Sequence, residues 1–142
     1  MDTQFNPSSP DTLELEARKE NLEQLLGFIE TRLEGCPMKA LMQINVAAEE
    51  VFVNIASYAY APGTGSARVS VRLQDDPRAA LITFEDSGVE FDPLAKADPN
   101  VSLPASERSI GGLGIFMTKK LMDEVKYLRR DGKNILTLRK LL

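Results

Sequence analysis

The chain has 142 residues, of which 43% are hydrophobic and 27% are charged, and this composition is typical of one soluble globular domain with its own core. It contains no histidine, which excludes a Ser-His-Asp triad, a phosphorylated histidine and a histidine-ligated metal. A net charge of −4 argues against direct binding of nucleic acid, the single cysteine fits a reducing, cytoplasmic environment, and no apolar run approaches the roughly 18 residues of a membrane span.

The first half of the chain predicts a strand and two helices behind a polar tail. Residues 1–10 are polar and contain two prolines, so we expect a frayed tail followed by a single domain over residues 11–142. Apolar and charged residues alternate over 13–17, which indicates a half-buried strand. Leucine and isoleucine recur at helical spacing over 22–33, and Gly35 ends that helix. A second helix begins at Pro37 and runs to about Tyr58, with a core stripe at Leu41, Ile44, Ala48, Val51 and Ile55.

The second half predicts strands in hairpins around one further helix. Alternation over 69–73 and an apolar run over 80–85 flank an Asp-Asp-Pro turn, and two more strands over 125–128 and 135–138 flank an Asp-Gly turn. Residues 93–110 lack a period and contain Pro99 and Pro104, so we expect a long irregular lid. The helix that follows is predicted to bury Leu113, Phe116, Met117 and Leu121 on one side. This order predicts an α+β two-layer sandwich, with a mixed, mostly antiparallel sheet and helices on one face.

Glu50 and Asn54 are the first candidate site residues. They lie four residues apart on the second predicted helix, so they project from one face, next to the apolar stripe. A carboxylate and an amide there suit a general base beside a metal-ligating oxygen. The simpler alternative, which the pattern taken alone favours, is an exposed glutamate and an asparagine near a helix end.

Asp86 and Gly88 follow directly after a predicted strand. Glycine lets the backbone turn sharply or approach a ligand closely, and an ionised carboxylate acts only as an acceptor. Such an acceptor suits the exocyclic amine of adenine and opposes the carbonyl of guanine. An ordinary β-turn with aspartate and glycine in their usual places explains the segment equally well.

Gly111, Gly112, Leu113 and Gly114 open the next predicted helix. Glycines at a helix start expose backbone N–H groups beside the positive end of the helix dipole, which suits a phosphate. The run matches neither the P-loop nor the Rossmann fingerprint. A flexible hinge is the alternative, and the anion site is the interpretation we favour. Four basic residues in and after this helix are expected to be solvated charges and not a binding patch: Lys119, Lys120, Arg129 and Arg130.

Together and in this order, the three motifs resemble the N, G1 and G2 boxes of the superfamily that contains gyrase B subunits, mismatch-repair ATPases and sensor histidine kinases. The resemblance is closest to the bacterial anti-sigma-factor serine/threonine kinases of the RsbW/SpoIIAB type and covers residues 13–142. Its tightest part lies between Gly111 and Tyr127, where Leu-Met-Asp-Glu-Val at residues 121–125 is typical of the kinase branch. This resemblance implies a histidine-kinase-like ATPase (Bergerat) fold.

The resemblance also implies a site for ATP and Mg²⁺. By position, Glu50 matches the base, Asn54 the Mg²⁺ ligand and Asp86 the aspartate that binds the adenine amine, with Gly88 beside it. Residues 93–110 match the ATP lid, in which Arg108 is the candidate for a phosphate-contacting arginine, although some relatives carry it closer to the glycines. The G2 residues implied at the phosphates are Gly111, Gly112, Leu113 and Gly114.

Two departures from the family pattern stand beside these matches. Tyr58, Ala59 and Tyr60 occupy positions where relatives often have His-Gly-Tyr, and Asn134 occupies a position where a threonine near the adenine is common.

The function implied is phosphorylation of a serine or threonine on a small STAS-type anti-anti-sigma protein, with a sigma factor as the other partner of a partner-switching pathway. A homodimer is compatible with this resemblance. The alternative is a binding module that uses ATP to order its lid and sequesters a sigma factor or a STAS protein without phosphoryl transfer. Glu50 favours the enzyme, whereas Tyr58 and Asn134 keep the alternative open. An ATPase without a protein acceptor is the third possibility.

Overall fold

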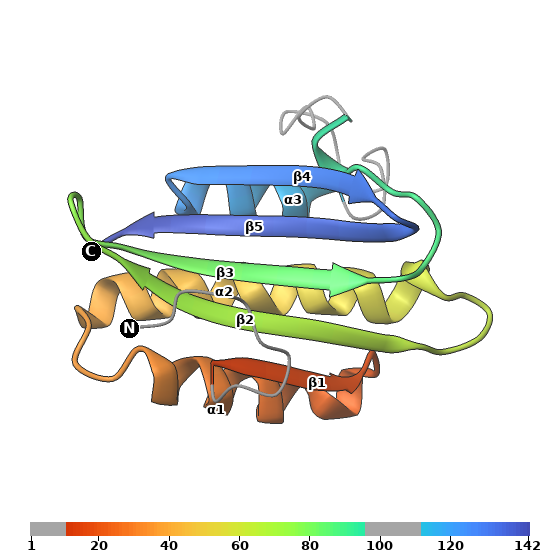
Figure 1. The fold of residues 1–142 in the computed structure, drawn as a ribbon, viewed down its shortest axis with the longest axis horizontal. Helices are drawn as coiled ribbons and strands as arrows, with labels where there is room; N and C mark the ends of the chain where they lie inside the picture. The colour runs from red at the N-terminus through yellow and green to blue at the C-terminus, as the bar shows by residue number, and fades with distance from the viewer. Residues whose placement is uncertain (1–10, 96–111) are drawn as a thin grey trace.

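A computed structural model describes residues 11–95 and 112–142 of the chain. In these residues, helices cover one face of a five-stranded sheet and leave the other face open (Figure 1). The α+β two-layer sandwich expected from the sequence is confirmed. The predicted tail, residues 1–10, and most of the predicted lid lie outside the described residues.

The helices form where apolar side chains recur every three or four residues. In α1 (Leu22–Arg32), Leu25 and Ile29 are fully buried, and the chain turns at Gly35, whose φ of +88° favours glycine. The helix α2 (Met38–Asn54) lies beside α1 and continues directly into a π-helical turn, η2 (Ile55–Ala59). The remaining helical segments are η1 (Lys19–Asn21), η3 (Pro93–Ala95) and α3 (Gly112–Leu121).

The sheet has the order β1-β2-β3-β5-β4, and every pairing among the described residues is antiparallel. Both predicted hairpins are present. The second turns at Asp131 and Gly132, whose φ values of +52° and +75° fit the tight turn that the Asp-Gly pair predicts. The strands are β1 (Thr12–Glu16), β2 (Ser66–Gln74), β3 (Ala79–Asp86), β4 (Glu124–Arg130) and β5 (Lys133–Leu141).

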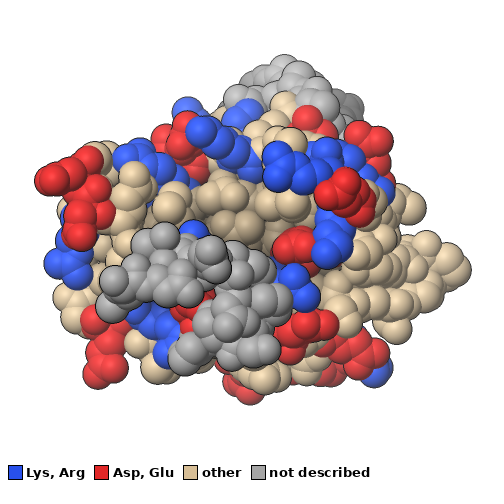
Figure 2. Space-filling model, viewed as in Figure 1, with Lys and Arg blue, Asp and Glu red and all other residues tan. Residues whose placement is uncertain are grey.

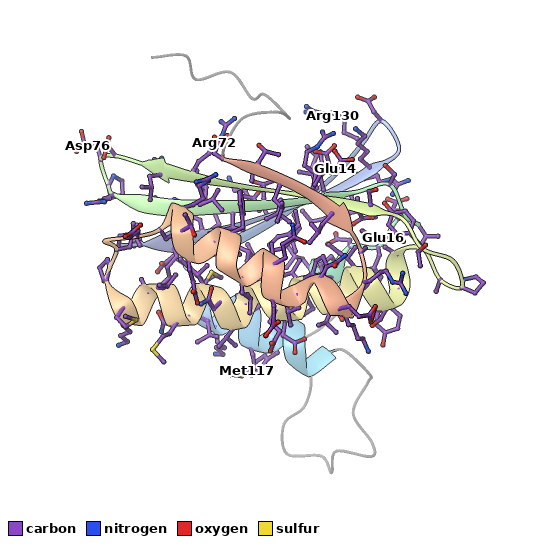
Figure 3. All side chains as sticks on the ribbon, turned by 90° about the horizontal axis from the view of Figure 1, so that it is seen from below. Glu14, Glu16, Arg72, Asp76, Met117 and Arg130 are labelled. Atoms are coloured by element: carbon purple, nitrogen blue, oxygen red, sulfur yellow. The ribbon has the colours of Figure 1, made fainter. Side chains whose placement is uncertain are left out.

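The core lies between the sheet and the helices. Alternate side chains of each central strand point toward the helices, and Val69, Ile82 and Leu138 are fully buried there. Glu14 and Arg72 point to the other side, away from the helices (Figure 3). This open face carries basic and acidic side chains interleaved (Figure 2), as is typical of a sheet with one solvated face.

The third helix differs in detail from its prediction. Met117 is 43% exposed and points outward, whereas its neighbour Thr118 is 1% exposed. The spacing of the apolar residues predicts Met117 on the buried side of this helix, which is wrong, because the buried side of α3 is set by its contact with α2 and includes the hydroxyl of Thr118. No helix in the described ranges is long and apolar enough to span a membrane.

Candidate functional site

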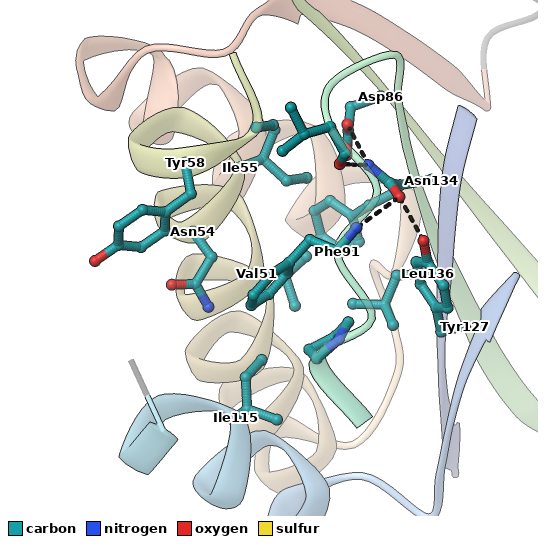
Figure 4. A pocket seen from close by; sticks show the side chains of 14 residues that line it. Val51, Asn54, Ile55, Tyr58, Asp86, Phe91, Ile115, Tyr127, Asn134 and Leu136 are labelled. Atoms are coloured by element: carbon teal, nitrogen blue, oxygen red, sulfur yellow. Dashed lines mark hydrogen bonds between the residues drawn. The ribbon is translucent and has the colours of Figure 1, made fainter. Parts of the chain in front are cut away.

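A pocket opens between the end of α2, the start of α3 and the strands β3, β4 and β5 (Figure 4). Most of its lining is apolar, with a few polar groups, which is the usual character of a small-molecule site. The side chains around it are Val51, Asn54, Ile55, Tyr58, Ala59, Phe84, Asp86, Val89, Phe91, Pro93, Ile115, Tyr127, Asn134 and Leu136.

The end of α2 brings Asn54 to this pocket. Asn54 is the last α-helical residue before the π-helical turn, and it lines the pocket together with Ile115 from α3. π-Helical turns are often found at functional sites. Glu50, one turn earlier, is half-buried and is not among the side chains that line the pocket formed by the described residues. Of the two residues that the sequence paired, the structure thus places only Asn54 in the pocket wall.

Asp86 ends β3 with its side chain in the pocket and only 6% exposed. Its Oδ1 accepts hydrogen bonds from Gly88 N at 2.9 Å and from Asn134 Nδ2 at 2.9 Å. Its Oδ2 accepts none from the residues that the structure describes. The carboxylate is therefore fixed through one oxygen and has the other available to a ligand in the pocket.

Gly88 takes part in an aspartate turn and packs closely against the end of the second helical region. Its N–H donates to Asp86, which is the usual aspartate turn. A Cβ at Gly88 would also lie 2.2 Å from Ala59 O, so only glycine fits against the π-helical turn. Val89 N donates to the same Ala59 O at 2.9 Å, which joins the loop after β3 to the end of α2.

Tyr60 connects the same loop to β2. Its hydroxyl donates to Ser66 O at 2.6 Å and accepts from Ser87 N at 2.7 Å. A Cβ at Gly65 would lie 2.4 Å from the Tyr60 ring, so the chain passes close to the ring there. Tyr60 therefore stabilises the scaffold around the pocket. Ala59 contributes its backbone oxygen, so alanine in place of the glycine common in relatives leaves this contact unchanged.

The polar end of the pocket contains residues that the sequence did not assign to a site. Tyr127 and Arg129 of β4 both donate to Asn134 Oδ1 in β5, at 2.5 and 3.2 Å. Arg129 Nη1 also donates to Gly88 O at 2.9 Å, so the prediction that this arginine is a solvated charge is wrong. Burial raises the pKa of Tyr127 above its ordinary value. In the sequence, the one indication of this polar end is Asn134, which stands where a threonine near the adenine is common in the family.

Gly112 and Gly114 lie in the first turn of α3, which confirms that the glycines open a helix. Ile115, the next residue, lines the pocket, so the helix begins beside it. Backbone N–H groups at such a start, and the helix dipole, favour a bound anion. Arg108, Gly111 and the side chain of Leu113 lie outside what the structure describes.

The donor set of the pocket fits Mg²⁺ that arrives with a nucleotide. Over residues 11–95 and 112–142, no group of three or more cysteine, aspartate or glutamate side chains is arranged to hold a metal ion. Mg²⁺ commonly takes one or two protein oxygens and completes its shell with phosphate and water. The amide oxygen of Asn54 can supply one such protein ligand at the pocket.

Comparisons of sequence and structure show which known proteins this chain is similar to. The sequence model of the histidine kinase-like ATPase domain matches residues 15–140. The chain is 28% identical over 133 residues to the serine/threonine-protein kinase BtrW of Bordetella bronchiseptica, covering 92% of this chain and 93% of that protein. It is 23% identical over 141 residues to the serine-protein kinase RsbW of Halalkalibacterium halodurans, covering 94% and 85% of the two chains. Among solved structures, the histidine kinase domain of the blue-light activated histidine kinase from Erythrobacter litoralis superposes with a TM-score of 0.49 at 17% identity, covering 87% of this chain and 60% of that one.

Proposed function

The chain belongs to the histidine kinase-like ATPase domain family, and from this membership we propose that it is a cytoplasmic, ATP- and Mg²⁺-dependent serine/threonine kinase. Its substrate is a STAS-type anti-anti-sigma protein, and a sigma factor is its second partner. The names of its relatives, serine and serine/threonine-protein kinases, support the kinase activity. The observation that carries the proposal is Asp86, a pocket carboxylate with one oxygen fixed and one available.

The pocket suits an adenine base. The available Oδ2 of Asp86 accepts a hydrogen bond from the exocyclic amine, while the apolar walls formed by residues such as Ile55 and Leu136 pack against the ring. A guanine would direct its carbonyl at the carboxylate, and two acceptors repel each other. This arrangement favours ATP over GTP.

The phosphate end of the site lies between α2 and α3. Backbone N–H groups of Gly112 and Gly114 at the start of α3 bind phosphate oxygens, and the Asn54 amide oxygen ligates the metal. Mg²⁺, when bound, neutralises charge on the phosphates. Glu50 lies one turn before Asn54 and takes the proton of the incoming hydroxyl as a general base.

Phosphate transfer to a protein tests the proposal directly. We would mix the purified chain with Mg-ATP and each STAS protein of its source organism, and measure the added phosphate by mass spectrometry. Because general-base assistance is typically worth about 10²–10⁴-fold, Glu50→Gln should slow transfer by about that factor and leave nucleotide binding intact. Asn54→Ala should weaken Mg²⁺-dependent binding and transfer together, and Asp86→Asn should weaken ATP binding.

One observation favours the second candidate, a binding module without phosphoryl transfer. Glu50 does not line the pocket that the described residues form, so its carboxylate is not prepositioned there. If the wild-type chain binds Mg-ATP and its STAS partner yet transfers no phosphate, the kinase proposal fails and the sequestering module replaces it.

A further inference from the structure

Asn134 uses both of its amide hydrogens inside the protein. It is 7% exposed near the start of β5, directly opposite Asp86 in the sheet register. Its Nδ2 donates to Asp86 Oδ1 at 2.9 Å and to Val89 O at 2.8 Å. One side chain therefore holds both the base-binding carboxylate and the backbone of the loop that follows it.

The oxygen of the same amide faces three donors. They are Tyr127 OH at 2.5 Å, Arg129 Nη1 at 3.2 Å and Phe91 N at 3.3 Å. Because Arg129 Nη1 also donates to Gly88 O, the loop is bonded at three backbone atoms: Gly88 O, Val89 O and Phe91 N. We call Asn134, Tyr127 and Arg129 the clamp; Tyr127 and Asn134 are shown in Figure 4.

This hydrogen-bond pattern fixes the orientation of the Asn134 amide. Turning the amide over would place its NH₂ against three donors and its oxygen against two acceptors, Asp86 Oδ1 and Val89 O. A threonine at this position has a single hydroxyl with one hydrogen, so it cannot donate to both acceptors at once. The clamp therefore depends on asparagine and not merely on a polar residue.

Two donors also orient the Asp86 carboxylate. Gly88 N and Asn134 Nδ2 both bond to Oδ1, so the direction in which Oδ2 meets a ligand is set before any ligand is present. A preoriented acceptor discriminates better between a base amine and a base carbonyl than one that can rotate, since rotation would relieve the repulsion.

We propose that the clamp is a positioning device that fixes the 87–91 loop and the Asp86 carboxylate in the free protein, and that Asn134 thereby sets the selectivity for a purine with an exocyclic 6-amine. This inference rests on the proposed function, because it assumes that Asp86 binds the base. Asn134 acts through Asp86 and the loop, so it is a positioning residue.

The first test needs no nucleotide. Amide hydrogen exchange, measured by NMR on the ligand-free protein, should quicken at Gly88 and Phe91 in Asn134→Thr, because the acceptors of these two N–H groups are displaced or lost. Tyr127→Phe keeps the ring in the pocket and leaves both bonds to Asp86 Oδ1 in place, so it should change the exchange at Gly88 less. Unchanged exchange at both amides in Asn134→Thr would overturn the clamp.

The second test measures selectivity by calorimetry with Mg-ATP and Mg-ITP, which has a carbonyl in place of the 6-amine. The loss of one oriented hydrogen bond costs about 1.4 kcal/mol. The ratio of the Kd for Mg-ITP to the Kd for Mg-ATP should therefore fall by about 10-fold in Asn134→Thr. If the role of Asn134 were purely structural, its substitution would weaken the binding of both nucleotides equally, and that result would overturn the selectivity claim.

Thr137→Val is the matched control. Thr137 lies on the same strand but on the open face of the sheet, where its hydroxyl is 3.2 Å from that of Thr83. Its substitution should leave both the exchange at Gly88 and the nucleotide ratio unchanged; a comparable fall of the ratio would overturn the assignment to Asn134. Wild-type protein that binds neither nucleotide would refute the proposed function and the selectivity claim together. Normal ATP preference with unchanged exchange in Asn134→Thr would refute the clamp alone.

Discussion

Gly88 is packed between the end of β3 and the π-helical turn without room for a side chain. The atom that an added Cβ would meet, at 2.2 Å, is the backbone oxygen of Ala59, which cannot rotate away as a flexible side chain could. Relief would require the loop or the turn to shift, and both hold residues that line the pocket. The requirement for glycine therefore comes from close packing and not from an unusual φ angle.

Gly88→Ala should consequently destabilise the protein by about 1–3 kcal/mol, the usual cost of overpacking. Gly27 provides a matched control, because nothing lies within 4 Å of a Cβ added there, in the exposed middle of α1. Gly27→Ala should stabilise by up to about 1 kcal/mol through helix propensity. Urea denaturation of both variants measures the two effects, and equal stability of Gly88→Ala and wild type would contradict the packing argument.

The raised pKa of Tyr127 predicts a pH dependence of stability. Burial is the main cause, so the folded state keeps the phenol protonated above the ordinary pKa of 10.0. The unfolded chain then loses this proton first, and the stabilising contribution is complete below pH 10 and is lost as the pH rises through the folded-state pKa.

Comparing wild type with Tyr127→Phe isolates the contribution of Tyr127 to the pH dependence of stability, because all other groups titrate in both proteins. The difference in free energy of unfolding between them, from urea curves, should stay constant below pH 10 and change above it in favour of the variant. A difference that stays constant at all pH values would show that Tyr127 titrates normally.

The sequence could predict which residues meet in the pocket only where a motif carries them. Asp86 and Asn54 were assigned from their neighbours along the chain, and both line the pocket. The bonds of Arg129 and Asn134 to Gly88 and Asp86 could not be predicted, because these partners are 41 and 48 positions away, although the resemblance already placed Asn134 near the adenine. Local spacing contains no information about such pairs, which depend on the register between β3, β4 and β5.

At the scale of whole elements, α2 both supplies the core and ends at the site. Its inner side packs against the sheet through residues such as Ile44 and Phe52, which are fully buried, whereas Val46 on its outer side is 49% exposed. This difference follows from the position of each residue around the helix axis.

Ile44→Ala and Val46→Ala should therefore differ strongly in stability. Removing a fully buried isoleucine leaves a cavity and costs about 2–5 kcal/mol, whereas a change at an exposed helix position stays within about 0.5 kcal/mol. Thermal unfolding followed by circular dichroism compares them. Similar midpoints for the two variants would mean that α2 does not pack as described.

The predicted elements agree with the structure where one period governs a segment, as in α1, β2 and β3. The π-helical turn after Asn54 was not predicted, since a sequence with an apolar period near 3.6 continues as an α-helix. Its last residue, Ala59, accepts a hydrogen bond from Val89 in the loop after β3, a contact that forms only in the folded protein. Tertiary contact thus accompanies the local departure from the regular helix.

At the scale of the molecule, the pocket joins the two layers, because its walls come from both helices and strands. A ligand that binds only the folded state stabilises it by about 2.7 kcal/mol at 100 times its Kd. For a domain of this size, each kcal/mol shifts Tm by about 2–4 °C, so Mg-ATP should raise Tm by about 5–10 °C. Differential scanning calorimetry measures the shift, and an equal shift with Mg-GTP would contradict adenine selectivity.

The chain has three tyrosines and no tryptophan. Tyr58 and Tyr127 line the pocket, and Tyr60 bonds to Ser87 in the loop beside it. The tyrosine fluorescence of the protein therefore originates at or next to the proposed nucleotide site, and no tryptophan emission overlaps it. Occupancy of the pocket should change that emission without any attached dye, and Tyr58→Phe, Tyr60→Phe and Tyr127→Phe would apportion the signal among three fluorophores at known positions.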